Sequence, residues 1–219
     1  FTADAAHELR TPIAAIRAQA QAALTVADAA ARRHALRSTL EACDRAARLV
    51  DQLLLLARID SGIPPEFERL DLAELARQVL AEATPEALVK GQRLELEAPG
   101  PHPMRGSTDL LRALIRNLVD NAVRYSPGGA RVRVTLAREP GHAVLVVEDS
   151  GPGLAEAERS RLGDRFFRGG QSQASGSGLG WSIVRRIAEL HGADVAIGRS
   201  PELGGLQVRL AFAGGEHAR

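Results

Sequence analysis

AHELRTPIAAIRAQAQAAL, residues 6–24, reads as one continuous helix except that a proline lies inside it. Proline removes a backbone hydrogen bond and crowds the carbonyl four residues earlier, at a cost of roughly 3 kcal/mol. Apolar positions nevertheless recur in steps of three and four on both sides of Pro12: Thr2, Ala6, Leu9, Ile13, Ile16, Ala20 and Ala23. We therefore predict a kinked helix that leaves the Glu8 carbonyl without its usual donor. The alternative is that Thr11 caps a helix starting at Pro12, with His7 in an irregular lead-in.

A second stretch with the same apolar period follows within residues 1–60, which contain no glycine. Its apolar positions are Leu36, Leu40, Cys43, Ala47, Val50, Leu54 and Ala57. A period of about 3.5 residues is typical of helices that pack by knobs into holes. The phase is lost near TVADAAARR, as expected at a turn. We predict a helical hairpin whose apolar seam is covered by a second copy, which gives a dimeric four-helix bundle. The alternative is that the hairpin packs against the rest of its own chain.

The stretch SGIPPE, residues 61–66, ends this helical region with a glycine and two prolines, which indicates a linker. We predict a helical domain over residues 1–60, a hinge over residues 61–65 and a second domain over residues 66–219. The second domain mixes predicted strands and helices: FERLD, LAELARQVLAEA, RLELE, STDLLRALIRNLVDNAVRY, ARVRVTLAR, HAVLVVED, WSIVRRIAELHG and two short strands ending near Phe212. These elements do not alternate strictly, so they favour an α+β sandwich with helices on one face of a sheet.

The composition limits the class of protein. A formal charge of +1 over 219 residues argues against a protein that binds nucleic acid directly, since such proteins usually carry a basic stripe. The single cysteine, Cys43, excludes an internal disulfide. No run of about 18 apolar residues is present. The sequence begins inside a helical pattern, which indicates a fragment of a longer protein whose earlier part, including any membrane segment, is not included.

His7 lies one position past the apolar seam, with Glu8 beside it and Thr11 one turn further on. An exposed imidazole next to a carboxylate can act as a nucleophile toward a phosphoryl group. At the typical histidine pKa of about 6.5, most imidazole rings are already neutral at pH 7. Glu8 would therefore orient the ring and accept the proton released on attack.

Polar residues also form a stripe on the predicted helix that contains NLVDNAVRY. Asn117, Asn121 and Arg124 recur at steps of four and three and so share one face. Amide oxygens can bind Mg²⁺, and an arginine can hold phosphate. The alternative is an ordinary solvated helix face. The stripe is compatible with a nucleotide site but does not demonstrate one.

Two glycine-rich stretches complete the candidate chemistry. Asp149 ends a buried strand and runs into Gly151 and Gly153, where a carboxylate can accept a hydrogen bond from an exocyclic amine such as that of adenine. Strand-Asp-Gly is also an ordinary turn. Later, glycines at alternate positions precede a helix whose N–H groups could receive phosphate oxygens: Gly176, Gly178 and Gly180.

We predict that residues 169–178 form a mobile lid, with Arg165 or Arg168 reaching a terminal phosphate from its hinge. The alternative for this segment is a flexible linker. The glycines fit neither the dinucleotide fingerprint nor the Walker loop, because no strand precedes them and no Gly-Lys-Ser/Thr ending follows.

Five motifs occur in a fixed order along the chain: AHELRTP, NLVDNAVRYSP, EDSGPGL, RFFRG and GSGLGWSIV. They resemble the H, N, G1, F and G2 boxes of sensor histidine kinases. FTADAAHELRTP and DQLLLLARIDSG look most like the subfamily whose partners are winged-helix response regulators. The resemblance implies a dimerisation and histidine-phosphotransfer hairpin followed by an ATP-binding domain of the GHKL type. It further implies the cytoplasmic portion of a bacterial inner-membrane sensor that acts on a response regulator receiver domain.

Carried over by position, the resemblance implies that His7 is the phospho-acceptor and Glu8 the general base. Thr11 would orient water when the regulator is dephosphorylated. ATP and Mg²⁺ are the implied ligands.

For the nucleotide, the resemblance implies that Asn117 binds Mg²⁺ and that Asn121 and Arg124 lie near the phosphates. It also implies that Tyr125 lies against adenine and that Asp149 binds the adenine amine. The remaining implied nucleotide-binding positions are Gly151, Gly153, Arg168, Gly176, Gly178, Leu179 and Gly180.

Two positions depart from the commonest family pattern. Trp181 stands where a smaller aliphatic residue is usual, which affects packing of the lid. Arg124 stands where lysine is frequent in the family. This keeps the positive charge but replaces a compact ammonium group with a planar guanidinium that has several N–H donors. Two other functions stay open at this point: a GHKL ATPase without phosphotransfer, and a dimeric scaffold whose ATP site is blocked by Trp181.

Overall fold

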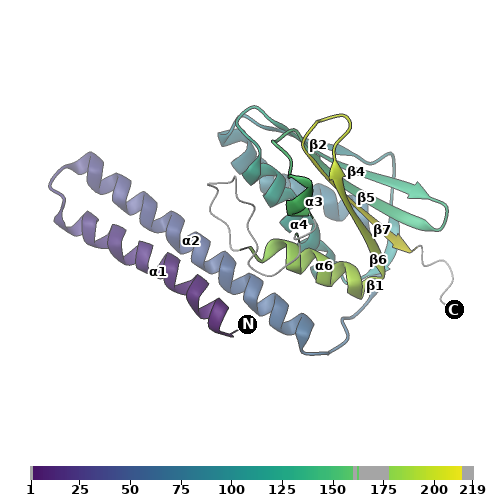
Figure 1. Cartoon of the computed structure of the whole chain (residues 1–219), viewed down its shortest axis with the longest axis horizontal. Coiled ribbons are helices and arrows are strands. Elements are labelled where there is room, and N and C mark those ends of the chain that lie inside the picture. The colour runs from purple at the N-terminus through teal and green to yellow at the C-terminus, as the bar shows by residue number, and fades with distance from the viewer. Residues whose placement is uncertain (1, 160–161, 163–177, 214–219) are drawn as a thin grey trace. The chain divides into compact units, whose positions relative to one another are not determined.

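The computed structural model describes the backbone of residues 2–159, 162 and 178–213, and their side chains except those of residues 2–8, 157 and 159. The chain divides into two compact units, residues 1–63 and residues 64–219. Figure 1 shows the first as a helical hairpin and the second as helices on a sheet. None of the helices in the described ranges combines the length and apolar character needed to cross a membrane.

The first unit consists of α1 (Thr2–Thr25) and α2 (Ala29–Asp60), which pack against each other. Pro12 lies inside α1, so the prediction of a helix that continues through the proline is confirmed, and a helix starting at Pro12 is excluded. Because proline has no N–H, the Glu8 carbonyl receives no helical hydrogen bond from it. At the turn, the Asp28 side chain caps α2 by accepting a hydrogen bond from the Ala31 N–H at 2.7 Å.

The two apolar rows of α2 have different environments. One row, buried in the hairpin, recurs every seven residues and includes Ala35, Ala42 and Leu49. The row that the sequence predicted as the seam is exposed: Leu36 (50%), Leu40 (65%), Val50 (40%) and Leu54 (58%). The row that holds the hairpin together was therefore not predicted from the sequence, and the predicted seam is a second apolar face that is exposed in the single chain.

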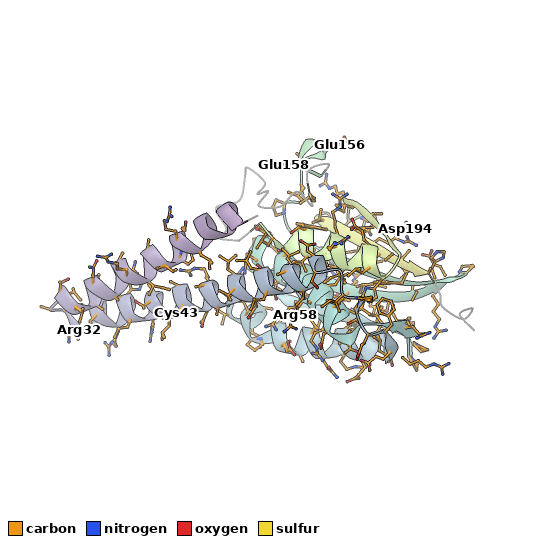
Figure 2. All side chains as sticks on the ribbon, turned by 90° about the horizontal axis from the view of Figure 1, so that it is seen from below. Arg32, Cys43, Arg58, Glu156, Glu158 and Asp194 are labelled. Carbon is orange, nitrogen blue, oxygen red and sulfur yellow. The ribbon has the colours of Figure 1, made fainter. Side chains whose placement is uncertain are left out.

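Cys43 belongs to this uncovered row and is also exposed. Arg32, Cys43 and Arg58 mark the beginning, middle and end of α2 in Figure 2. We call the row formed by Leu36, Leu40, Cys43, Val50 and Leu54 the outer apolar row of α2.

In the described residues of the second unit the elements are β1 (Glu68–Asp71), α3 (Leu72–Val89), β2 (Arg93–Glu97), β3 (Pro103–Gly106), α4 (Thr108–Tyr125), β4 (Arg131–Glu139), β5 (His142–Asp149), α5 (Glu156–Arg159), α6 (Gly180–Leu190), β6 (Ala193–Arg199) and β7 (Leu206–Ala213). Five strands form one sheet in the order β2-β4-β5-β7-β6, in which only β2 and β4 run parallel. A small antiparallel pair, β1 and β3, stands apart from it.

One face of the large sheet is covered by helices. Along β4, Val132, Val134 and Leu136 are buried while the residues between them are not, as expected of a sheet covered on one side. Figure 1 shows α3, α4 and α6 on the same side of the strands. The predicted α+β sandwich with helices on one face is confirmed.

Every predicted strand and helix of this unit is present among the described residues, and the structure adds three features. One is the short helix α5, which no predicted element covers. α3 continues beyond the predicted stretch, through Pro85, to Val89. β3 was not predicted, because its four residues begin with a proline and show no alternation. It forms only because β1 lies beside it, with Leu70 opposite Met104.

Candidate functional site

The start of α6 lies directly against the polar stripe of α4. The Asn117 Nδ2 donates a hydrogen bond to the Ala113 carbonyl at 2.7 Å, which fixes the orientation of the amide. A methyl group built on Gly180 would lie 3.1 Å from Asn117 Oδ1 and 3.5 Å from Asn121 Nδ2. Glycine therefore permits this close approach, and two motifs far apart in the sequence meet here.

The same corner contains an unpaired donor. The Asn121 Nδ2 is buried and has no hydrogen-bond partner within the described part of the chain. A buried amide without an acceptor costs free energy, so its presence indicates a place where a ligand acceptor fits. Further along the stripe, Arg124 is half-buried and the Tyr125 ring is 37% exposed. The stripe thus offers amide, guanidinium and aromatic groups along one helix face.

A second corner is formed around Asp149 at the end of β5. Its side chain is buried, and Oδ1 accepts hydrogen bonds from the backbone N–H groups of Gly151 at 2.8 Å and Leu206 at 3.2 Å. Burial raises the pKa of the Asp149 carboxyl, although these two N–H groups act in the opposite direction. Within the described residues Oδ2 accepts no hydrogen bond, which leaves it as the acceptor for a ligand.

Glycines allow the backbone to close around this carboxylate. A methyl group on Gly205 would collide with the Oδ1 and carbonyl oxygen of Asp149, and one on Gly151 would lie 2.9 Å from the same Oδ1. The Gly205 N–H also donates to the Asp149 carbonyl at 3.1 Å. Gly153 has a φ of +71°, a conformation that favours glycine. Sequence reasoning predicted Gly151 and Gly153 but missed Gly205, whose only signal was the Gly204-Gly205 pair before the last strand.

Ser126 was also missed, although it joins the two corners. It follows α4 directly, and its Oγ is buried without a hydrogen-bond partner in the described ranges. The Oγ lies 3.0 Å from the point where a methyl on Gly151 would stand. The end of α4 and the end of β5 therefore meet at Ser126 and Gly151.

The structure does not describe the side chains of all the other predicted site residues. His7 and Glu8 lie in α1, but their side chains are outside the described residues, and Thr11 is exposed one turn after His7. Arg168 and Gly176, with most of the predicted lid, also lie outside the described residues.

At the start of α6, Gly178 has a φ of +68°, and the side chain of Leu179 is fully buried. The Ser182 hydroxyl donates to the Leu179 carbonyl at 2.8 Å and so fixes the first turn. Leu179 therefore anchors the start of α6. Because its side chain is buried in the protein, only its backbone could contact a ligand. Trp181 is half-buried one position after Gly180.

Two families match most of the chain. Residues 1–62 match the family described as the His Kinase A (phospho-acceptor) domain, and residues 106–214 match the Histidine kinase-, DNA gyrase B-, and HSP90-like ATPase family. The chain is 40% identical to the sensor protein kinase PmrB of Pseudomonas aeruginosa, over 96% of this chain and 44% of that protein. It is 42% identical to the sensor protein QseC of Escherichia coli strain K12, over 97% of this chain and 47% of that protein. The chain thus spans less than half the length of these two relatives.

A solved structure of the cytoplasmic segment of the histidine kinase QseC is also similar. It is 32% identical with a TM-score of 0.54, and the match covers 78% of this chain and 94% of that one. The chain therefore belongs to the sensor histidine kinase family, as its five ordered motifs predicted.

We expect Asp149→Asn to stabilise the ligand-free protein at neutral pH. Asparagine keeps an Oδ1 acceptor for Gly151 and Leu206 but removes the buried charge. Because the folded-state pKa of Asp149 lies above its ordinary value of 3.8, this carboxyl favours folding only when protonated. That contribution is present below pH 3.8 and is lost as the pH rises through the folded-state pKa.

The midpoint of thermal unfolding, followed by circular dichroism, should therefore be higher for Asp149→Asn than for the unchanged protein at pH 7. The difference should shrink as the pH is lowered toward 3.8. A lower midpoint for the variant at pH 7 would contradict this account of the buried charge.

Proposed function

We propose that this chain is the catalytic core of an ATP-dependent protein-histidine kinase. It phosphorylates its own His7 and passes the phosphoryl group to an aspartate on the receiver domain of a response regulator. One observation carries the proposal: the same chain contains a phospho-acceptor hairpin and a corner suited to a nucleotide. In that corner Gly180 lies against Asn117 and Asn121.

The corner around Asp149 is the proposed adenine site. Its Oδ2 would accept a hydrogen bond from the exocyclic amine, and the exposed ring of Tyr125 would lie against the base. The unpaired Asn121 Nδ2 and the Arg124 guanidinium would donate to phosphate oxygens. Glycines at the start of α6, with Arg168, would close over the nucleotide.

Mg²⁺ fits the donor set around Asn117. In the described ranges no group of three or more His, Cys, Asp or Glu side chains is arranged to hold a metal ion. One amide oxygen from the protein suits Mg²⁺, which usually keeps several waters and takes phosphate oxygens as ligands. When bound, Mg²⁺ neutralises charge on the phosphates and polarises the terminal phosphoryl group.

In the proposed reaction the neutral His7 ring attacks the γ-phosphorus of ATP. A nitrogen–phosphorus bond forms, the bond to the β-phosphate oxygen breaks, ADP leaves, and Glu8 takes the ring proton. The phosphoryl group then passes to the regulator's aspartate. Thr11, exposed one turn after His7, would orient the water that later hydrolyses that aspartyl phosphate. Residues 61–65 would act as the hinge that lets the two units approach.

The proposed protein works as a homodimer through residues 1–60, and it binds no nucleic acid directly. Its parent would be a bacterial inner-membrane sensor, with this chain as the cytoplasmic portion. The sensor names of the relatives support this assignment.

The first test is to incubate the chain with Mg²⁺ and γ-labelled ATP and to map the modified residue. His7→Gln should abolish labelling and leave nucleotide binding unchanged, because His7 acts only as the acceptor. Binding is followed by the fluorescence of Trp181, the only tryptophan. The matched control is His34→Gln, which removes an exposed histidine of α2 and should be labelled normally.

The label should survive alkali and be lost in acid, as a phosphoramidate requires. Retained label on His7→Gln would move the acceptor elsewhere. Release of ADP without any labelled protein would instead favour the ATPase without phosphotransfer.

The second test concerns adenine recognition. Asp149→Asn should weaken binding of Mg·ATP by about 1–3 kcal/mol, because the base amine loses a charged acceptor. That corresponds to roughly 5- to 150-fold in the dissociation constant measured by Trp181 fluorescence. An unchanged constant would place the base elsewhere.

The third test concerns the outer apolar row of α2. Leu40 is 65% exposed and lies in the middle of this row. Covering it with a second copy would bury a leucine from each protomer, at about 1.5–3 kcal/mol each. Leu40→Asp should therefore raise the dimer dissociation constant at least 100-fold in analytical ultracentrifugation.

Leu24→Asp is the matched control, because Leu24 is 87% exposed but lies outside the apolar period of α1. It should remain dimeric. If both variants stay dimeric, the outer apolar row is not the dimer interface.

A further inference from the structure

The C-terminal end of α4 is held by a side chain that belongs to none of the five motifs. Gln92, 4% exposed, lies just before β2. Its Nε2 donates to the carbonyl oxygens of Val123 at 3.0 Å, Ser126 at 2.9 Å and Pro127 at 3.0 Å. Val123 lies in the last turn of α4, where carbonyls have no partner within the helix, and Ser126 and Pro127 follow directly. Val123 also accepts from Lys90 and Pro127 from the Ala130 N–H, whereas within the described residues the Ser126 carbonyl accepts only from Gln92.

Lys90 binds the same helix end. Its Nζ donates to the carbonyl oxygens of Val123 at 2.9 Å and Arg124 at 3.2 Å. A cation at the C-terminus of a helix is also favoured by the helix dipole. We call Lys90 and Gln92 together the α4 clamp.

The backbone around the α4 clamp is itself fixed. The Gln92 N–H donates to the Ala87 carbonyl at 2.9 Å at the end of α3. On the other side, the Arg93 N–H donates to the Ala130 carbonyl at 2.9 Å, and the Gly129 N–H donates to the Lys90 carbonyl at 3.1 Å. The α4 clamp is therefore tied to α3, to the turn after α4 and to the edge of the sheet, so its two donors have defined positions.

The clamped carbonyls lie next to the groups proposed to contact the nucleotide. Arg124 and Tyr125 lie between Val123 and Ser126, so their backbone is held on both sides. Ser126 in turn borders Gly151 in the Asp149 corner. Any rotation of the last turn of α4 would move the arginine and the tyrosine relative to that corner.

We propose that Lys90 and Gln92 are positioning residues for the nucleotide site: they set the orientation of the last turn of α4, and through it Arg124 and Tyr125, against Asp149. This inference rests on the proposed function, since it assigns these groups to ATP. Neither clamp residue is assigned a contact with the nucleotide itself.

The experiment measures autophosphorylation of the full chain at a series of Mg·ATP concentrations, with thermal midpoints recorded for every variant. Gln92→Met keeps the length of the side chain but removes its donors. It should raise the KM for ATP roughly tenfold, as expected when the Ser126 carbonyl loses its donor and the last turn shifts. The rate at saturating ATP should stay within about twofold, because the clamp acts on binding geometry and not on His7.

Lys90 supplies a second measurement in case the buried Gln92 variant does not fold. Lys90→Met should raise the KM at least threefold, and Lys90→Arg, which keeps a cationic donor, should restore it to near the unchanged value. Gln78→Met is the matched control, because Gln78 is an exposed glutamine on α3. Gln78 also accepts a hydrogen bond from Arg112 of α4 at 2.6 Å, but Arg112 lies near the beginning of that helix, so the variant should leave KM unchanged.

A merely structural role predicts a different result. If Gln92→Met and Lys90→Met lower the thermal midpoint but leave KM unchanged at temperatures where they are folded, the positioning role is wrong. A fall in the saturated rate with unchanged KM would also overturn it. Failure of the unchanged protein to bind ATP would instead refute the proposed function.

Discussion

The buried carboxylate of Asp149 is the constraint around which the second unit is organised. A carboxylate inside a protein requires hydrogen bonds, and here they come from the backbone of Gly151 and Leu206. Those N–H groups can reach it only because Gly151 and Gly205 lack side chains. The end of β5, the start of β7 and the residue after α4 are thereby drawn to one point. This arrangement leaves one carboxylate oxygen for a ligand, at the cost of a raised pKa.

At the other corner of the site, a glycine again allows two elements to approach closely, here beside asparagine side chains. α6 approaches α4 closely because its first residue is Gly180, and the approach leaves the Asn121 amide buried without an acceptor. A ligand that supplies an acceptor at this point would satisfy the amide. The two corners lie at different points along α4, so the orientation of this one helix decides whether they can serve the same ligand. The α4 clamp fixes that orientation from outside the motifs.

In the first unit, the two apolar rows of α2 have different roles. The row with small alanines lets α1 and α2 approach and forms the hairpin, whereas the outer row leaves large leucines in water. Exposed leucines at regular helical spacing favour association with another helical surface. Pro12 lies in the same hairpin and is the last residue of the motif that contains His7. Because proline has no N–H, it gives the Glu8 carbonyl no helical hydrogen bond.

Residue order and residue type were enough to predict the helical hairpin, the α+β class of the second unit, almost every described strand and helix, and the order of the five motifs. These follow from local periodicity and from residue types, both of which can be read along the chain. Which row of α2 is buried in the hairpin could be seen only in the folded structure, since both rows are apolar and repeat with helical spacing. The folded structure also revealed β3, Gly205, Ser126 and the Lys90–Gln92 pair. Their roles depend on contacts with residues about 25 or more positions away, and no local pattern encodes such distances.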